Sequence, residues 1–518
     1  MTTQNRATWS DLPTEIVEEI LAVLDPPSLL ALSKLNRYLN YLALETFFGV
    51  ALYRISHLRV LAPPSPHDET LTLRAYYLAL CLEHVAELEH WIYGDVRQSL
   101  QQFHILISLA HRLRSLKSLK LRITLLAPCW GWGNHRVEGE VLITMLHELV
   151  EAAMSKGCEK LRIEGNSFPY CGLSASGIRA FRSRETVSTR AYKWMKRCVS
   201  FPCISSPDES PPPSSLDEKI SDDFSTSPRS HITSCILSRP ALLGSTALPF
   251  IAKLLRRNAG TITYLDMNCF GLTRSWWKAR ALSLALFNGI TLPHLATLIL
   301  HIQVSTISTG NFAWFLSRHS QISTLEVHDP STLPQDTSMI ISSHRPLSLP
   351  SLRILRIPAR VADWIFTNMM EPLVLKTLEV YGRSHPDGFD KLGDAIYQIR
   401  CCSGHIQNLM LHANWWQYGN DLMENGNDRL NLQNFPSNIE VQKLCFVFEI
   451  SPVITSMCPI KLAGGLVNVM RLFPLVKELE MRFGENSASV LDGLGTREMV
   501  RKKITEQFPD LCVSSVLC

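Results

Sequence analysis

A short hydrophobic motif recurs along most of the chain: an apolar residue, two variable residues, a leucine, one variable residue and a second apolar residue. The copy at residues 295–300 reads Leu-Ala-Thr-Leu-Ile-Leu. Because successive side chains of a β-strand point to opposite faces, apolar residues two positions apart predict a short strand with one buried face. The central leucines of the ten clear copies are Leu119, Leu161, Leu265, Leu298, Leu325, Leu355, Leu378, Leu409, Leu444 and Leu479. Weaker copies occupy residues 55–60 and 85–90.

The segments between the motifs carry the hydrophobic period of helices. Such patterns occupy residues 247–257, 279–287, 389–399 and 462–473. Strand and helix in turn, repeated along a chain, are typical of a solenoid with parallel strands. Successive central leucines from Leu265 onward are 23 to 35 residues apart, so we expect the repeat to be irregular. A single α/β domain with parallel strands is the alternative interpretation.

The N-terminal segment carries a different pattern. Residues 12–24 read Leu-Pro-Thr-Glu-Ile-Val-Glu-Glu-Ile-Leu-Ala-Val-Leu. Leu12, Ile16, Ile20 and Leu24 recur every four residues and predict an apolar stripe along one helix. The proline suits the first helical turn, where its missing amide proton is not needed. We therefore expect an amphipathic helix whose apolar surface is wider than one face.

Further short helices are predicted directly after this segment. The residues Asp-Pro-Pro-Ser at 25–28 form a turn signal, and residues 29–44 are rich in leucine and tyrosine. This pattern predicts one or two helices. Three helices within about 45 residues are close to the lower limit for a self-sufficient core. The excess apolar surface therefore predicts a partner that covers it, and the rest of this chain is one candidate for that partner.

These N-terminal residues resemble the F-box family. In that family the helices dock on a Skp-type adaptor, which links them to a cullin–RING ubiquitin ligase. Residues that carry the resemblance also include Leu35, Asn36, Arg37 and Tyr41. The resemblance implies that the adaptor-binding residues are Leu12, Pro13, Glu15, Ile16, Ile20, Leu24, Leu29 and Leu30. The alternative is an ordinary N-terminal helical cap on the domain that follows.

The predicted fold class is α+β overall. A small all-α, F-box-like unit occupies residues 9–50, and an irregular α/β solenoid that resembles leucine-rich repeats follows it. The first part of this solenoid covers residues 51–180 and its main part covers residues 240–518. Residues 181–239 are dense in proline, serine and acidic residues, which have little to bury, so we predict a disordered insertion.

Candidate target-binding residues follow from this resemblance. In a solenoid similar to leucine-rich repeats, parallel strands line the concave side, so variable residues within and just after the motifs face one groove or its rim. Large polar and aromatic side chains there suit a peptide or loop of another protein. The candidates are His301, Gln303, Tyr381, Trp415 and Trp416, together with His328 and His412.

Composition narrows the class of protein. The chain has 518 residues, of which 46% are hydrophobic, and a formal net charge of +4. This charge indicates no nucleic-acid partner. The 14 cysteines show no paired metal-ligand spacing, and the N-terminal residues show no apolar signal region. No run approaches the roughly 18 apolar residues that a membrane span requires. We expect an intracellular protein of the cytoplasm, the nucleus or both.

Motifs that carry chemistry are missing from the sequence. It has no glycine-rich phosphate loop, no zinc-protease motif and no nucleophile elbow. We therefore expect no catalytic residue, no metal and no cofactor, and we do not expect an enzyme. The predicted function is that of a substrate-recognition subunit of a Skp–cullin–F-box ubiquitin ligase. The alternative is a repeat scaffold for protein–protein interaction that has no link to a ligase.

Overall fold

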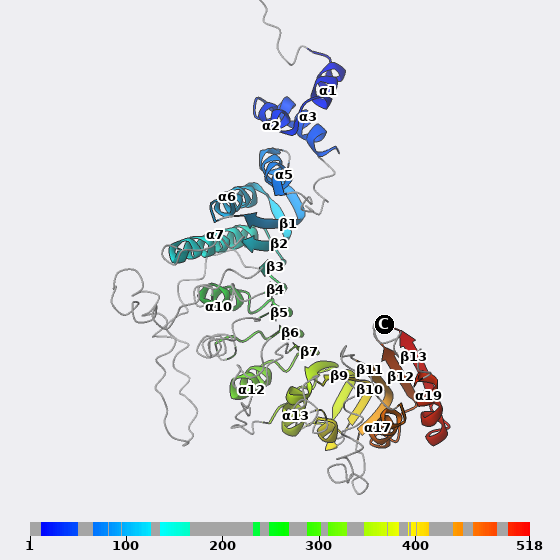
Figure 1. Ribbon diagram of the computed structural model, residues 1–518. Helices are drawn as coiled ribbons and strands as arrows, with labels where there is room; N and C mark the ends of the chain where they lie inside the picture. Colours follow the sequence, from blue (N-terminus) through cyan, green and yellow to red (C-terminus); the bar gives the residue numbers. More distant parts are fainter. Residues whose placement is uncertain are drawn as a thin grey trace, which may run out of the picture. The chain divides into compact units, whose positions relative to one another are not determined.

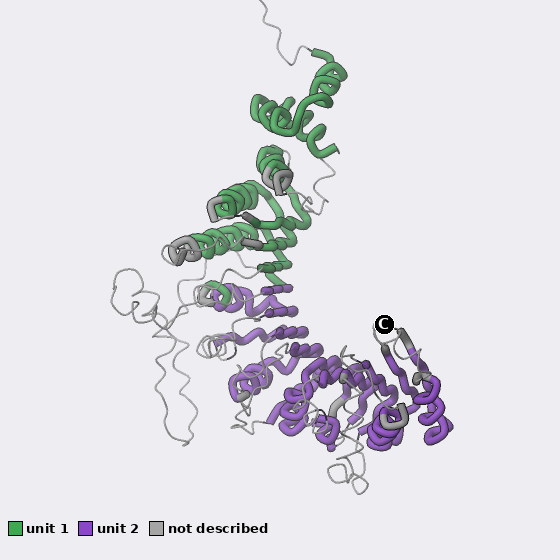
Figure 2. The backbone as a smooth tube through the Cα atoms, in the orientation of Figure 1, with its two compact units in different colours: residues 1–233, 246–251 green, residues 234–245, 252–518 purple. Residues whose placement is uncertain are grey.

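The computed structural model (Figure 1) describes part of the chain in two compact units, coloured separately in Figure 2. The first unit comprises residues 1–233 and 246–251, and the second comprises residues 234–245 and 252–518. The described residues are 12–49, 66–80, 82–94, 96–125, 135–165, 231–238, 248–268, 287, 289–301, 309–328, 346–369, 371–382, 392, 395–399, 401–402, 404–413, 439–448, 459–483 and 496–517.

Three short helices open the first unit: α1 (Thr14–Ala22), α2 (Pro26–Leu32) and α3 (Arg37–Phe48). Asp25 caps α2, because its carboxylate accepts a hydrogen bond from the Ser28 amide at 3.0 Å. Asn36 caps α3 in the same way, through the Leu39 amide at 2.8 Å. Gly49 ends α3 with a φ of 63°, a left-handed conformation that suits glycine. The helix after the proline turn and one further helix confirm the pattern predicted from residues 25–44.

A small core holds these helices together. Tyr38 of α3 also donates a hydrogen bond from its hydroxyl to Thr14 Oγ1 of α1 at 3.1 Å. Partly buried Leu24, Leu32 and Phe47 pack against the core. The buried core residues are Val17, Leu21, Leu29, Leu39, Leu42 and Ala43. The inward face of α1 is therefore formed by Val17 and Leu21.

The rest of the first unit alternates helices and parallel strands. The sequence of elements is α5 (Pro66–Leu78), β1 (His84–Gly94), α6 (Val96–Arg112), β2 (Ser115–Leu125), α7 (His135–Ser155) and β3 (Lys160–Gly165). Strand β2 lies between β1 and β3 and is parallel to both. Leu88, Leu119 and Leu161 are register partners and are buried on one face. The weak motif at residues 85–90 is thus a strand.

The second unit continues the same arrangement. Its helices include α12 (Thr309–Ser317), α13 (Ala359–Asn368), α17 (Pro459–Arg471) and α19 (Thr496–Gln507), and α10 (Leu248–Arg257) is divided between the units. Figure 1 shows α12, α13, α17 and α19 along one side of the strands. The strands are β4 (Ser234–Ser238), β5 (Tyr264–Asn268), β6 (Thr297–His301), β7 (Thr324–His328), β8 (Ile354–Pro358), β9 (Leu373–Tyr381), β10 (Gly404–Ala413), β11 (Ile439–Phe448), β12 (Glu478–Phe483) and β13 (Cys512–Leu517).

The repeated motif determines the register of these strands. Every neighbouring pair from β4 to β13 is parallel, and the strands follow chain order. Leu265 pairs with Leu298, Leu298 with Leu325, and the series continues through to Leu479. These leucines are at most 1% exposed. The predicted strands are confirmed, and the chain beyond the N-terminal helices has an α/β arrangement.

Two strands were not predicted. Strand β4 falls within residues 181–239, where the sequence predicts an insertion, and β13 follows the last motif. In both strands another residue occupies the leucine position: Cys235 pairs with Leu265, and Val513 pairs with Leu479. A buried strand face needs an apolar residue but not a leucine. The remainder of the predicted insertion, residues 181–230, and the weak motif at residues 55–60 lie outside the described residues.

The C-terminal ends of three helices carry buried polar side chains. Asn258 donates to the Leu254 carbonyl at 2.8 Å, and Asn368 donates to the Trp364 carbonyl at 2.8 Å. Each bond runs back four residues, so the buried side-chain amide finds its acceptor in the last turn of its own helix. His319 is the equivalent residue after α12, where Nδ1 lies 2.5 Å from the Phe315 carbonyl.

His319 also joins α12 to the segment before β6. Its Nε2 accepts a hydrogen bond from the Leu292 amide at 2.8 Å, so the ring must be neutral. Burial lowers the pKa of His319 to about 4, and only 1% of the residue is exposed. We expect His319→Ala to lower the free energy of unfolding by about 2 kcal/mol, because it leaves a buried amide without its acceptor. Thermal or urea unfolding at pH 7 measures this change.

The same histidine predicts a dependence of stability on pH. An unfolded histidine binds a proton near pH 6.5, whereas folded His319 does so only near pH 4. Between these pH values the unfolded state binds more protons than the folded state. The contribution of His319 to the free energy of unfolding therefore falls as the pH decreases from 6.5 to 4. His319→Ala should therefore lose less stability than the wild type between pH 7 and 5. The control, His294→Ala at an exposed histidine, should behave as the wild type; equal pH profiles for all three would contradict the assignment.

Candidate functional site

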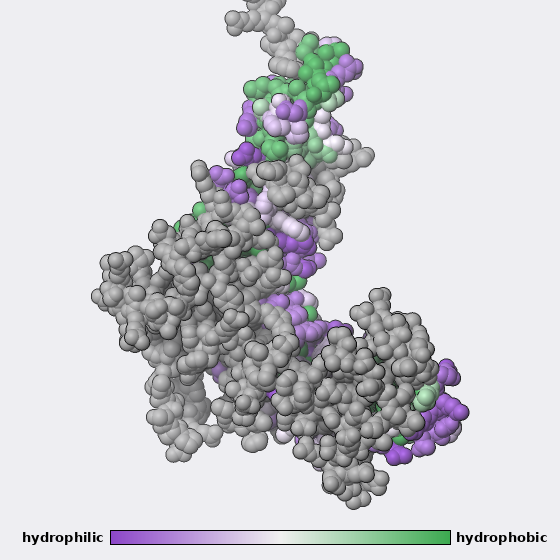
Figure 3. Space-filling model, in the orientation of Figure 1, coloured by the Kyte–Doolittle hydropathy of each residue, from purple (hydrophilic) through white to green (hydrophobic). Residues whose placement is uncertain are grey.

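The first candidate surface is the outer side of the three N-terminal helices. Leu12 and Ile16 are 40% and 43% exposed, whereas Val17 and Leu21 of the same helix are fully buried. Ile20 and Leu24 lie between these extremes, and Pro13 and Glu15 are exposed. Figure 3 shows hydrophobic residues gathered at this end of the first unit. Large apolar side chains held outside a complete core mark a surface that suits a partner.

Other exposed apolar residues extend this surface. Val23 is 82% exposed and Leu35 is 63% exposed, and Tyr38 and Tyr41 of α3 are also exposed. The family resemblance assigns Leu29 and Leu30 to adaptor binding. Both are buried, with only 4% and 5% of their surface exposed. Leu29 belongs to the helical core. The structure thus exposes four of the predicted residues in and before α1, partly buries Ile20 and Leu24, and buries the pair on α2.

The second candidate surface is the open face of the strands in the second unit, turned away from the buried leucines. Register pairing places open-face side chains in rows that run across the strands. His301 pairs with His328, and Tyr381 pairs with His412. We call His301, His328, Tyr381 and His412 the ring row. Of the other candidate residues, Gln303, Trp415 and Trp416 lie outside the described residues.

Neighbouring rings of this row contact one another. The centroids of His301 and His328 are 4.5 Å apart with an interplanar angle of 16°, which is a stacked arrangement. Tyr381 lies 6.0 Å from His328 and 4.8 Å from His412. Burial, followed by the charge of His328, lowers the pKa of His301 to about 4. His301 is therefore neutral at pH 7.

A charged row lies beside the rings, one open-face position earlier on each strand. Arg356 Nη1 is 2.7 Å from Glu326 Oε1, and its Nε is 2.9 Å from Glu379 Oε2. Glu326 pairs with Arg356, and Arg356 pairs with Glu379, in adjacent strands. Asp266 of β5 lies 3.7 Å from His301 Nε2. We call Asp266, Glu326, Arg356 and Glu379 the charge row.

The two glutamates of this row, Glu326 and Glu379, stay ionised at pH 7. Hydrogen bonding to His328 and the charge of Arg356 lower the pKa of Glu326. Burial raises the pKa of Glu379, but His412, whose Nε2 is 2.6 Å away, and Arg356 outweigh it, so the pKa lies below its ordinary value. The ring row and the charge row together form a polar, partly buried strip in which Glu326 and Glu379 carry negative charge.

The sequence predicted the rings but not the charges. His301 and Tyr381 were candidates because they follow their motifs. Glu326, Arg356 and Glu379 are the variable residue between the leucine and the last apolar residue of the motif. This position could have identified them as open-face residues, because in every copy of the motif its side chain faces away from the buried leucine.

The open face of the first unit carries a separate ionic cluster. Lys120 Nζ lies 2.6 Å from Glu89 Oε1, with both side chains less than 10% exposed. Arg122 lies 3.3 Å from Glu89 and 3.1 Å from Glu164. Its guanidinium also stacks over the Trp91 ring at 4.9 Å. These charges satisfy one another, which makes the cluster a structural feature of β1, β2 and β3.

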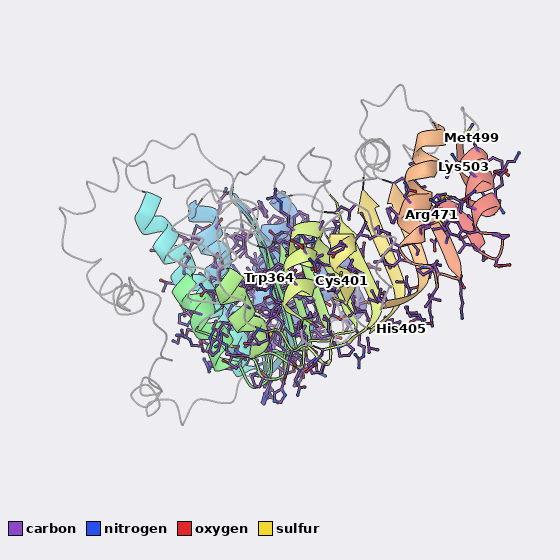
Figure 4. All side chains as sticks on the ribbon, turned by 90° about the horizontal axis from the view of Figure 1, so that it is seen from below. Trp364, Cys401, His405, Arg471, Met499 and Lys503 are labelled. Carbon is purple, nitrogen blue, oxygen red and sulfur yellow. The ribbon has the colours of Figure 1, made fainter. Side chains whose placement is uncertain are left out.

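The described residues contain no cluster of three or more His, Cys, Asp or Glu side chains placed to hold a metal ion. Cys401 and Cys402 lie together before β10, and burial raises the pKa of Cys402 to about 11, which leaves it a poor nucleophile. Figure 4 labels Cys401 and His405, and the Nδ1 atom of His405 lies 3.4 Å from Glu440 Oε2. No helix of the described part is both long enough and apolar enough to cross a bilayer.

Comparison with known proteins identifies the domain that carries the first surface. Residues 9–46 match the family model of the F-box domain, which covers α1, α2 and most of α3. The chain therefore carries an N-terminal F-box domain. F-box domains in general bind a Skp-type adaptor within cullin–RING ubiquitin ligases, and F-box proteins are generally non-catalytic. No curated protein matches the chain.

Proposed function

We propose that this protein is a substrate-recognition subunit of a Skp–cullin–F-box ubiquitin ligase. The observation that carries the proposal is the F-box match at residues 9–46 together with the exposed apolar side chains of α1. Leu12, Pro13, Glu15, Ile16, Ile20 and Leu24 contact the adaptor. Leu29 and Leu30 are buried, and Leu29 belongs to the helical core, so both support this surface from α2.

The strands and helices that follow the F-box bind the target. The proposed architecture is an irregular solenoid similar to leucine-rich repeats, and its support is the register of the motif leucines. The target lies on the open face of the second unit, at His301 and Tyr381. Gln303, Trp415 and Trp416 remain proposed members of the same surface.

Catalysis in this proposal is by proximity. The adaptor connects the chain to a cullin and a RING subunit, which deliver a ubiquitin-loaded enzyme. Holding a target lysine close to that enzyme replaces a bimolecular encounter with a local one. This chain supplies position and no reacting group.

Reconstitution tests the proposal. The purified full chain, mixed with a Skp-type adaptor, should elute as a stoichiometric complex in size-exclusion chromatography. A chain that lacks residues 1–50 should elute alone while its remaining strands stay folded by circular dichroism. If the full chain does not bind the adaptor, the repeat scaffold without a ligase becomes the better interpretation.

A further inference from the structure

The register of β5 to β12 arranges open-face side chains in rows. The middle row, which includes the charge row, consists of Asp266, Ile299, Glu326, Arg356, Glu379, Met410, Cys445 and Glu480. The row one position later has two paired parts, Asn268, His301 and His328 on β5 to β7 and Pro358, Tyr381, His412, Val447 and Arg482 on β8 to β12. The row one position earlier consists of Tyr264, Thr297, Thr324, Ile354, Thr377, Asn408, Lys443 and Glu478.

These rows contain more carboxylates than cations. The cations are Arg356, Lys443 and Arg482. The carboxylates are Asp266, Glu326, Glu379, Glu478 and Glu480. This open face is therefore negative by two charges, whereas the whole chain has a formal net charge of +4. The acidic character is local to this face and opposite in sign to that of the protein.

The rings supply a second feature that favours one kind of ligand. Stacked His301 and His328, with Tyr381 and His412 beyond them, offer π surface next to ionised Glu326 and Glu379. A guanidinium or ammonium group is attracted both to a ring face and to a carboxylate. The aliphatic part of an arginine or lysine side chain also packs on rings. An acidic or phosphorylated segment would meet the carboxylates and be repelled.

We propose that the open face of β5 to β10 binds an extended cationic segment, rich in lysine or arginine, across the ring row and the charge row. This inference rests on the proposed function, because it gives the chemical class of the target that the receptor recognises. Five strand spacings of about 4.8 Å separate β5 from β10, so the strip is about 24 Å long. An extended peptide rising about 3.3 Å per residue would cover it with about seven residues.

The test uses two synthetic probes and the full chain without adaptor. One is a fluorescein-labelled ten-residue peptide of alternating arginine and serine, and the other has glutamate in place of arginine. Fluorescence anisotropy should show saturable binding of the arginine peptide, weakened by added salt, and no binding of the glutamate peptide. Because the whole protein is positive, general attraction favours the glutamate peptide. Preferential binding of that peptide, or binding of neither, would overturn the proposal.

Variants then locate the binding face. Asp266→Asn with Glu379→Gln removes two carboxylates at nearly constant volume and should weaken binding of the arginine peptide roughly tenfold. Glu498→Gln makes the same kind of charge change on α19, away from the rows, and should leave the affinity within about twofold. Equal weakening by Glu498→Gln would mean that the binding is general and would overturn the proposal.

A further variant separates unfolding from loss of binding. If the double variant is unfolded by circular dichroism, Asp266→Asn alone decides, and a smaller, about threefold loss is expected because only one carboxylate is removed. No loss with this folded variant would count against the inference. The outcome is independent of the ligase assignment, because adaptor binding is measured separately: a chain that binds the arginine peptide but no adaptor would refute only the F-box role.

Discussion

Replacing Ile16 and Ile20 by Asp is expected to abolish binding of the Skp-type adaptor. Ile16 is 43% exposed and Ile20 is partly exposed, while the neighbouring Val17 and Leu21 complete the internal core. A partner that covers α1 would bury two carboxylates without compensating charges, at a cost of at least about 2 kcal/mol each. The affinity should fall by about a thousandfold. Titration of the adaptor by isothermal calorimetry measures it.

The matched control for this experiment is Val141→Asp. Val141 lies on α7 and is 41% exposed, so it places the same side chain at a similarly exposed apolar position outside the F-box. Its adaptor affinity should equal that of the wild type. Both proteins should keep the same circular dichroism spectrum, because neither change touches a buried residue. Undiminished binding by the Ile16 and Ile20 variant would exclude α1 as the contact surface.

The periodicity of α1 predicted the helix but did not determine which of its apolar residues face the core. Four apolar residues at a spacing of four indicated a stripe through Leu12 and Ile16. The structure buries Val17 and Leu21, exposes Leu12 and Ile16, and leaves Ile20 and Leu24 partly exposed. An apolar surface wider than one face leaves two choices for the inward side, and the packing of α2 and α3 decides between them. In a domain that binds a partner, the apolar residues left exposed indicate the binding surface.

The strands could be predicted because the apolar residues that define each strand lie together in one short motif. Leu298 and Leu300 are both buried and are two residues apart, and this local alternation requires no knowledge of the fold. Strand β4 escaped prediction because Cys235 replaces the leucine. Burial requires only an apolar residue at this position, whereas the motif requires a leucine. The motif therefore misses a strand in which another apolar residue takes that place.

The charge row could not be predicted as a group, although each member was visible. Glu326, Arg356 and Glu379 are separated by 30 and 23 residues in sequence. They meet because Leu325, Leu355 and Leu378 are register partners, which brings the next residue of each strand into line. Each motif determines the direction of one side chain, while the ion pairs between strands depend on register. The local sequence therefore predicts the direction of each side chain but not the ion pairs between strands.

Leu378→Ala tests whether this leucine row holds the second unit together. Leu378 is fully buried and pairs with Leu355 on one side and Leu409 on the other. Truncation removes buried apolar volume between close-packed neighbours and should lower the local free energy of unfolding by about 3 kcal/mol. Amide hydrogen exchange in β9 and β10 should accelerate by about a hundredfold.

The neighbouring residue provides the control, because Thr377→Ala changes the open face of the same strand. Thr377 is partly exposed, so its truncation should change the local stability by less than about 0.5 kcal/mol. Its pairing with Asn408 and Ile354 involves the backbone and survives the change. Exchange rates in β9 that rise equally in both variants would mean that burial of the leucine face is not what stabilises the strands. A large effect of Leu378→Ala alone would place the stability of this unit in the leucine row and leave the open face available for a ligand.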